Sequence, residues 1–261
     1  MKSGRIVFLC LITSMLSTPA YSAVTVFSDD FDDYNIREWA RSGNKGSQAK
    51  VVNSPTRKGN YALRVTLDRK KDPVPFRTEL QAKKTKLFLK RDYWTGFSIQ
   101  LPANWKQDVH SDTLLQIHGL PDSGEKWRMP LMALAPEKGY WKLIIRWDAR
   151  SKTPGTKPQG AKTFKLGSIQ PGKWVDWVIH HKPSYSTGGL VEVWKNGKKV
   201  LSYKGPNAYN DKGGMVTKIG VYKPAWRPSA RSWSRSVVSS REVYFDEFVI
   251  KENGSLSSVQ P

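Results

Sequence analysis

Apolar and polar residues alternate in short runs along most of the chain, and this two-residue period is typical of β-strands with one buried face. In segment 61–67, for example, the buried face would carry Leu63, Val65 and Leu67. No long segment shows the 3.6-residue period of an amphipathic helix. Further strands are predicted over residues 24–31, 76–80, 93–101, 113–119, 129–135, 140–147, 174–181, 190–194, 199–203, 216–222 and 242–250.

Residues that favour tight turns separate these strands. Asn196-Gly197 predicts a hairpin between segments 190–194 and 199–203, because both residues adopt a positive φ at low cost. Residues 149–162, rich in Lys, Pro, Gly and Thr, and the basic segment 224–240 are predicted loops. Many short strands with regular turns and no internal repeat predict an all-β, single-domain sandwich.

The first 22 residues have the composition of a secretory signal peptide. Lys2 and Arg5 precede a mostly apolar stretch, and Ala20 and Ser22 supply small residues at the −3 and −1 positions of a cleavage site. The apolar stretch is too short for a good membrane span, and the rest of the chain has no other long apolar run. We therefore expect a secreted or periplasmic protein with one domain over residues 23–261 and no membrane partner.

The chain is strongly basic, with 43 Lys and Arg against 22 Asp and Glu and a net charge of +21. Loss of the signal, which carries Lys2 and Arg5 but no acidic residue, would leave +19. Such a protein is expected to bind a polyanion, which could be an acidic polysaccharide, a nucleic acid or an anionic cell surface. The alternative is a basic surface that is simply solvated. The sequence contains no nucleic-acid-binding motif and starts with a signal, so we expect no nucleic-acid partner.

The mature chain is also free of cysteine, because Cys10 lies within the signal. It can therefore form neither a disulfide nor a thiolate metal site. Packing of the core has to stabilise the fold.

Three of the predicted strands carry polar residues on a face that needs a separate explanation. A polar pair on a strand face requires either solvent or a ligand. On the third of these strands, Gly220 leaves no side chain between Lys218 and Tyr222. We predict that the three strands form the floor of a polar groove suited to an acidic sugar, with the pairs Arg77 and Glu79, Gln116 and His118, and Lys218 and Tyr222.

The segments Arg77-Thr78-Glu79-Leu80, Gln116-Ile117-His118 and Lys218-Ile219-Gly220-Val221-Tyr222 follow one another in this order. They resemble the R-T-E-L, Q-I-H and K-x-G-x-Y signature strands of the jelly-roll alginate lyases. The wider pattern, which includes Gln-x-His-Gly and a final Tyr-Phe-Asp-Glu strand, resembles the heparin lyase I and glucuronan lyase group more closely. This likeness covers nearly all of the mature chain. It implies a concanavalin-like β-jelly-roll sandwich and polysaccharide lyase activity.

A polysaccharide lyase removes the proton next to a uronate carboxylate and then expels the oxygen at the 4-position. The resemblance implies that Arg77 and Gln116 neutralise the carboxylate, since cationic and hydrogen-bonding groups offset the charge that develops there. His118 and Tyr222 would share the two proton transfers. Which of them is the base depends on the face of the sugar that bears the proton.

Five further residues are predicted to bind the substrate. Some of them have a plain structural alternative: Glu79 could act only by orienting Arg77, Lys218 could be solvated, and Trp226 could pack over a sheet edge. Arg227, Arg231 and Arg235 of the basic loop are expected to add to the binding of a polyanion. The predicted substrate-binding residues are Glu79, Lys218, Lys223, Arg146 and Trp226.

The chemistry requires no cofactor, and a structural calcium ion is a separate hypothesis. Asp30 lies in an acidic turn after the first strand and Asp246 in the last strand, and terminal strands of such sandwiches often pair. A solvated turn beside an edge strand is the alternative.

The substrate is predicted to be a glucuronan- or heparin-like chain, with alginate second, and the protein is expected to be a monomer. The absence of two suitably spaced carboxylates near the groove strands argues against a retaining hydrolase. A non-catalytic lectin on the same fold is the alternative function. It would need no His–Tyr pair, so the presence of His118 and Tyr222 favours the enzyme.

Overall fold

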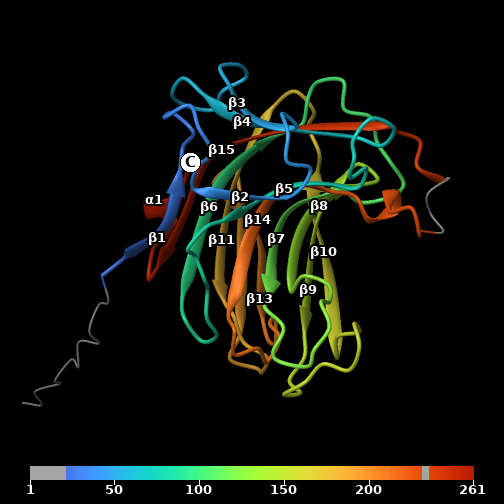
Figure 1. Cartoon of the computed structure of the whole chain (residues 1–261). Coiled ribbons are helices and arrows are strands. Elements are labelled where there is room, and N and C mark those ends of the chain that lie inside the picture. Colours follow the sequence, from blue (N-terminus) through green and yellow to red (C-terminus); the bar gives the residue numbers. More distant parts are fainter. Residues whose placement is uncertain (1–21, 231–234) are drawn as a thin grey trace, which may run out of the picture.

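Two antiparallel β-sheets packed face to face form the protein in a computed structural model that describes residues 22–230 and 235–261 (Figure 1). The helical elements named here are a 3-10 turn, η1, and one short helix, α1. The elements are β1 (Val24–Asp29), β2 (Trp39–Gly43), β3 (Ala49–Val52), β4 (Ala62–Asp68), β5 (Arg77–Ala82), β6 (Tyr93–Gln100), β7 (Thr113–Gly119), β8 (Met132–Glu137), β9 (Tyr140–Trp147), β10 (Gly160–Ser168), β11 (Trp174–Lys182), β12 (Leu190–Lys195), β13 (Lys198–Lys204), β14 (Met215–Tyr222), η1 (Pro224–Trp226), β15 (Ser240–Glu252) and α1 (Leu256–Val259).

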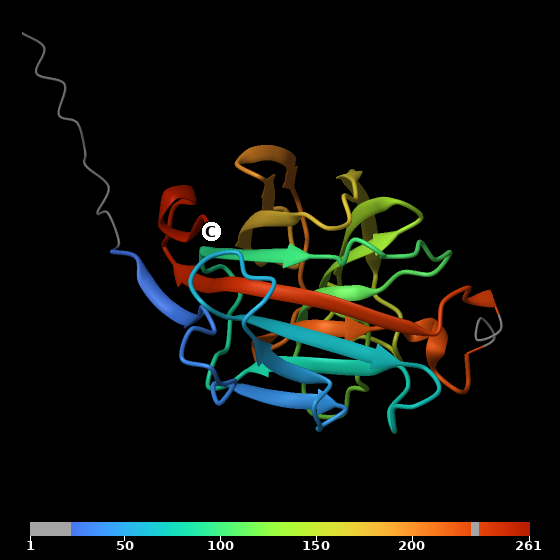
Figure 2. The ribbon, with the colours of Figure 1, turned by 90° about the horizontal axis from the view of Figure 1, so that it is seen from above.

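The chain crosses repeatedly between the two sheets. The first sheet has the order β13-β12-β11-β6-β15-β4-β3, with β1 also paired to β15. Its long strand β15 lies between β6 and β4 (Figure 2). The second sheet has the order β10-β9-β8-β7-β14-β5-β2. In this sheet β7, β14 and β5 are neighbours, although β14 is far from the other two in sequence. The predicted all-β jelly-roll sandwich is confirmed.

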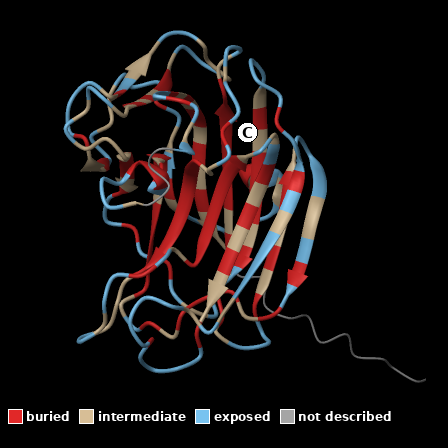
Figure 3. Ribbon diagram, turned by 90° about the vertical axis from the view of Figure 1, so that its right-hand side faces the viewer, coloured by how far each residue is buried: buried red, intermediate tan, exposed pale blue. Residues whose placement is uncertain are grey.

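One continuous core fills the space between the sheets, because each strand turns its apolar face inward. The three apolar residues predicted for β4 are all fully buried. The strands at the centre of the sandwich are buried along most of their length, whereas some outer strands also carry exposed residues (Figure 3). The inward residues of the second sheet include Leu115, Ile117, Leu143, Ile145, Ile219 and Val221.

Three strands of the structure were not predicted: β2, β3 and β10. Strand β10 lies at the edge of the second sheet, and its first residues fall within the predicted loop 149–162. Lys162 and Lys165 are two of the exposed residues that hide its alternation. Exposed lysines are a common device that keeps an edge strand from pairing with another chain. Short or polar edge strands of this kind give too weak an apolar signal for prediction from sequence.

Some sequence-based predictions fall on residues outside the described part of the chain. These are residues 1–21 of the predicted signal peptide and Arg231 in the basic loop. Across residues 22–230 and 235–261, no helix is long and apolar enough to cross a membrane.

A charged cluster around His180 lies on the outer face of the first sheet. The imidazole stacks on the indole of Trp94, with ring centroids 4.0 Å apart. Its Nε2 is 2.9 Å from Oδ2 of Asp92, and its Nδ1 is 3.1 Å from Oε2 of Glu192. Burial disfavours the charged ring, but the hydrogen bonds to the two carboxylates outweigh this effect and raise the pKa of His180. The same contacts help to lower the pKa of Asp92 and of Glu192 against the effect of burial.

The cluster predicts a pH-dependent contribution to stability. The pKa of His180 is higher in the folded state than its ordinary value of 6.5. The stabilisation of the fold by protonated His180 is therefore fully present below pH 6.5 and is lost as the pH rises through the folded-state pKa. The pKa values of Asp92 and Glu192 are lowered, so the stabilisation that these carboxylates contribute is lost at acid pH instead. We expect His180→Gln to lower the melting temperature by roughly 2–4 °C per kcal/mol lost, most strongly between about pH 5 and 6.5.

Thermal unfolding of wild type and variant across a pH series measures this effect. The exposed Lys204→Gln change on β13 serves as the control. A His180→Gln effect that is the same at about pH 9 as at about pH 6 would contradict the charge-based account.

Candidate active site

A groove of about 580 Å³ lies on the outer face of the second sheet. Its floor comes from β5, β7, β8, β9 and β14, and residues of the loops around 127–130 and 224–227 complete its walls. All four predicted catalytic residues line it, together with two of the predicted substrate-binding residues. The sequence-based expectation that these residues lie together is met for Arg77, Gln116, His118, Tyr222, Lys218 and Arg146.

The pairing of β14 with its two neighbours aligns these side chains. Lys218 is directly opposite Gln116 on β7, and Tyr222 is directly opposite Arg77 on β5. Between Ile219 and Tyr222 the register with β7 shifts by one residue, which is a β-bulge.

Gly220 lies at this bulge with a φ of +134°, and a Cβ there would be only 2.4 Å from the carbonyl oxygen of Thr78. Only glycine fits such a close approach between strands. The Gly220 in the signature segment therefore determines how Tyr222 is aimed.

The carboxylate of Glu79 lies beneath the groove floor and is almost fully buried. Its Oε2 is 3.2 Å from Nε of Arg77, and its Oε1 accepts a short hydrogen bond from the amide of Gln116. Burial raises the pKa of Glu79, while the charges of Arg77 and Lys218 and the Gln116 hydrogen bond oppose the shift. Glu79 does not line the groove, so the expectation of direct substrate contact is not met. It holds the two side chains that do line it.

The imidazole of His118 is fixed by a main-chain contact. Its Nδ1 is 2.9 Å from the carbonyl oxygen of Gly119. Because a carbonyl oxygen only accepts, a hydrogen on Nδ1 satisfies this contact, and in that tautomer of the neutral ring Nε2 carries the lone pair. Burial lowers the pKa of His118, and the nearby charge of Lys218 acts in the same direction. The imidazole of His118 is therefore mostly neutral near pH 7.

Cationic groups surround the phenol of Tyr222. The guanidinium carbon of Arg77 is 4.6 Å from the centre of its ring, and that of Arg227 is 5.3 Å away. Arg146 and Lys218 also line the groove, and burial lowers the pKa of each. This arrangement suits a negatively charged ligand whose carboxylate replaces the water around these cations.

The groove residues that reasoning from the sequence missed include Trp127 and Arg128. Trp127 is 61% exposed, and its ring centroid is 5.0 Å from that of His118. Arg128 lines the groove with a buried side chain, 3.1 Å from Glu125 and also paired with Asp211. Both lie in a loop without periodicity, where the sequence alone gives no sign of which way a side chain points. An exposed tryptophan beside a histidine offers a flat apolar surface for a sugar ring.

Comparison with known proteins identifies the family. The family model described as "Polysaccharide lyase" matches residues 29–249. The chain belongs to the polysaccharide lyase family. It is therefore an enzyme, and its substrate is a polysaccharide.

Solved structures share the fold of this lyase at low sequence identity. The endo-β-1,4-glucuronan lyase of the fungus Trichoderma reesei superposes with a TM-score of 0.76 at 18% identity, covering 91% of this chain and 99% of that one. The alginate lyase Aly36B gives 0.56 at 15% identity, covering 88% and 96%. The binding domain of Paraclostridial Mosquitocidal Protein 1 gives 0.53 at 12% identity, covering 87% of this chain and 48% of that chain. No curated protein matches the sequence.

The likeness to a binding domain shows that the fold by itself does not decide between catalysis and binding. The family match decides for the enzyme rather than for the lectin alternative.

The structure corrects the expectation for Lys223 and Trp226, since both side chains are fully buried and neither lines the groove of the lyase. The ammonium of Lys223 is 2.8 Å from Asp108 and 2.8 Å from Asp112. Adjacent residues along a strand point to opposite faces, so a Tyr222 that faces the groove turns Lys223 inward. The two-residue period could have revealed this orientation in the sequence.

These residues form a buried cluster that attaches the basic loop to the sandwich. Asp108 accepts a 2.5 Å hydrogen bond from the hydroxyl of Ser236, which in turn accepts one of 2.8 Å from the indole N–H of Trp226. Arg241 on β15 is 2.9 Å from Asp112. Burial would raise the pKa of Asp108, but its hydrogen bonds, with Lys223 foremost, lower it to about 2.

The two acidic residues considered for calcium have other partners. Asp246 is fully buried, and its oxygens accept hydrogen bonds from the main-chain N–H groups of Arg57, Lys58 and Glu247. Asp30 accepts one from the N–H of Asp32. Within the described ranges, no group of three or more His, Cys, Asp or Glu side chains is arranged to hold a metal ion. The calcium hypothesis stays a prediction that these contacts do not support.

The buried cluster predicts a large loss of stability when Lys223 is removed. Lys223→Met should lower the free energy of unfolding by about 3–5 kcal/mol, because it leaves Asp108 and Asp112 buried with too little compensating charge. Urea denaturation measures this difference. The exposed Lys198→Met change in β13 is the control and should stay within about 0.5 kcal/mol of wild type. Equal stability of the two variants would contradict this role of the cluster.

Proposed function

We propose that this lyase cleaves a uronic-acid-containing polysaccharide by β-elimination. The observation that carries the proposal is that four side chains line one groove: Arg77, Gln116, His118 and Tyr222. In the proposal, Arg77 and Gln116 bind the carboxylate, and His118 and Tyr222 transfer protons. The proton at C5 of the uronate leaves, its electrons form the double bond between C4 and C5, and the bond from C4 to the bridging oxygen breaks. The oxygen leaves with a proton supplied by the enzyme.

Neutralising the carboxylate is the first requirement, since a proton next to a charged carboxylate is only weakly acidic. Arg77 offers a planar guanidinium, and Gln116 has a second amide N–H beyond the one that Glu79 accepts. Because Glu79 holds both groups from below, they are in place before the substrate arrives. Donors fixed in advance stabilise developing charge without a further reorganisation cost.

Proton transfer is the second requirement. Nε2 of the neutral His118 can accept a proton, and the hydroxyl of Tyr222 can donate one or exchange it. In a β-1,4-linked glucuronan, the hydrogen at C5 and the oxygen at C4 lie on the same face of the ring. Two groups that reach the sugar from neighbouring strands of one groove floor suit such an elimination.

Glucuronan is the substrate that we favour, with heparin-like chains and alginate next. The fungal glucuronan lyase superposes with a higher TM-score than the alginate lyase Aly36B, 0.76 against 0.56. The cationic lining of the groove supports a polyuronate over a neutral chain. The signal-like composition of residues 1–22 supports action outside the cytoplasm, where such polymers occur.

The direct test is incubation of the purified protein with glucuronan, heparin and alginate while ultraviolet absorbance is recorded. Only elimination creates a double bond conjugated to the carboxylate. An increase with glucuronan that exceeds the others supports the proposal. Hydrolysis products without an absorbance increase would overturn the mechanism, and a preference for alginate would overturn only the choice of substrate.

Tyr222→Phe and His118→Ala should each lower kcat by about 10²–10⁴-fold while substrate binding stays nearly intact, because proton transfer matters in the transition state. Since the pKa of His118 is lowered, the acid limb of kcat/KM in the wild type should lie below pH 6.5. Steady-state kinetics and a pH–rate profile measure both effects. A fully active Tyr222→Phe variant would remove the tyrosine from the mechanism.

Trp127 should contribute mainly to binding, because its ring is exposed at the groove beside His118. We expect Trp127→Ala to raise KM by about tenfold, the scale of one aromatic contact, with a smaller change in kcat. Trp127→Phe retains a flat ring and serves as the matched control. A KM for Trp127→Ala equal to that of wild type would show that the ring does not touch the substrate.

A further inference from the structure

A second cavity lies on the opposite face of the sandwich. It has a volume of about 590 Å³, within the usual range of ligand pockets, and it forms between the outer face of β4 and β15 and the loop after β6. Val65 and Leu67 of β4 point into the core, so Arg64 and Thr66, which alternate with them, point outward. We call this cavity the back cleft. None of the groove residues described above lines it.

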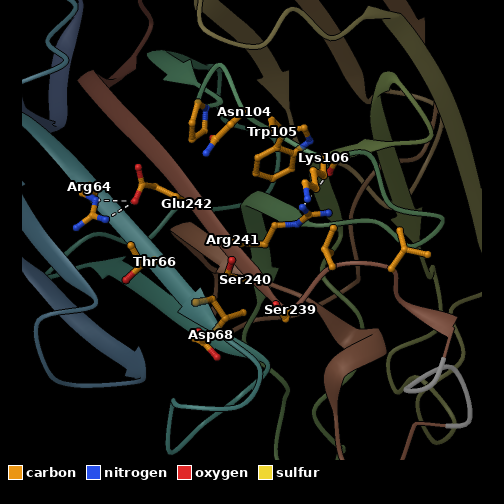
Figure 4. A pocket seen from close by; sticks show the side chains of 14 residues that line it. Arg64, Thr66, Asp68, Asn104, Trp105, Lys106, Ser239, Ser240, Arg241 and Glu242 are labelled. Carbon is orange, nitrogen blue, oxygen red and sulfur yellow. Dashed lines mark hydrogen bonds and ion pairs between the residues drawn. The ribbon is translucent and has the colours of Figure 1, made fainter.

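The charges of the back cleft are largely paired within the protein. Arg64 donates to Oε2 of Glu242 from Nε at 2.8 Å and also from Nη2, and Tyr244 donates to Oε1 of the same carboxylate. Figure 4 shows this ion pair on one side of the cleft, with Trp105, Lys106 and Arg241 on the other. Arg241 in turn is bound by Asp112 at 2.9 Å. Of the cations that line the cleft, Arg64 and Arg241 are therefore each paired with a carboxylate, and among the described residues only Lys106 is not.

A fixed aromatic ring forms one wall. The guanidinium carbon of Arg241 is 4.2 Å from the centroid of the Trp105 ring, and Trp105 packs partly against the core. Because Arg241 is itself nearly buried and bound to Asp112, the indole has little freedom to move. A half-buried indole presents a flat apolar surface with one polar N–H.

Several polar groups beside this ring have no protein partner. Within the part of the chain that the structure describes, no protein atom accepts a hydrogen bond from the indole N–H of Trp105 or the ammonium of Lys106, and none bonds to the side-chain amide of Asn104. The hydroxyl of Ser240 also lines the cleft and has no bond to the side chain of any other described residue. These groups supply both donors and acceptors, and they converge beside an aromatic surface.

We propose that the back cleft is a second, non-catalytic saccharide-binding site that takes an uncharged, hydroxyl-rich segment of a sugar chain. Vicinal hydroxyls both donate and accept, which matches the free amide, hydroxyl, indole N–H and ammonium groups, and the apolar face of a sugar ring matches Trp105. With Arg64 and Arg241 paired to carboxylates, Lys106 alone gives little attraction for a polyanion. The back cleft therefore recognises hydroxyls, whereas the groove recognises carboxylates. Such a site holds a polysaccharide to the enzyme without occupying the groove.

The test uses the full chain carrying Tyr222→Phe, so that no sugar is cleaved. Titration calorimetry with cellohexaose, the uncharged counterpart of a β-1,4-glucuronan segment, measures binding. This choice of probe rests on the proposed glucuronan substrate, so a mannohexaose titration runs beside it. Binding of either oligosaccharide supports a saccharide site, and a preference for mannohexaose would count against the glucuronan assignment alone.

The site is located by Asn104→Ala combined with Lys106→Ala, two exposed residues whose side chains make no contacts that the fold needs. We expect affinity for the neutral hexaose to fall about tenfold or more, since at least two hydrogen bonds are lost. The exposed Lys50→Ala on the neighbouring strand β3 is the matched control and should bind as the parent does. Cleavage of a short uronate oligosaccharide by the double variant, with Tyr222 intact, should equal that of wild type.

Salt provides an independent readout. Hexaose binding should change less than about twofold between 0.1 M and 1 M salt, whereas binding of glucuronan in the groove weakens as its charges are screened. If neither hexaose binds, or if the double variant binds as tightly as the Lys50→Ala control, the back cleft is not a saccharide site. Hexaose binding that weakens with salt as strongly as glucuronan binding would also overturn the proposal.

Discussion

The carboxylate of Glu79 lies under the groove floor, where it contacts Arg77 and Gln116 at once. A buried carboxylate is costly unless charged and hydrogen-bonded partners surround it, so its position ties it to both neighbours. Those neighbours are the groups that would meet the substrate carboxylate. The same interaction therefore stabilises the floor of the groove and orients the site. Gly220 completes the arrangement, because the absent side chain lets β14 approach β5 closely.

A second buried set of charges shapes the far end of the groove. Lys223, Asp108, Asp112 and Arg241 join the end of β14, the loop before β7 and the start of β15. Because Lys223 directly follows Tyr222, the cluster fixes the backbone at the proposed catalytic tyrosine. It also anchors Trp226 and therefore the segment that brings Arg227 over the tyrosine ring. Buried ion pairs contribute little net stability, but they define one geometry and penalise others.

The two faces of the sandwich present different chemistry on the same kind of scaffold. The groove on the second sheet carries a histidine and a cluster of cations, while the back cleft on the first sheet carries two paired cations, Arg64 and Arg241, beside uncharged hydrogen-bonding groups and Lys106. Proteins that share this fold include lyases and a binding domain. Function therefore depends on which outward positions of the strands carry which side chains, and on the loops that border them.

The sequence by itself determined the strands and the groove floor, because the two-residue period assigns side chains to faces without knowledge of strand pairing. It placed Arg77, Gln116, His118 and Tyr222 on outward faces, and their order matched a known family. Tertiary structure alone decided the edge strands β2, β3 and β10, whose exposed or short segments carry little apolar signal. It also decided that Trp127 stands at the groove while Trp226 is buried, since a residue in a loop has no period and points where its contacts direct it.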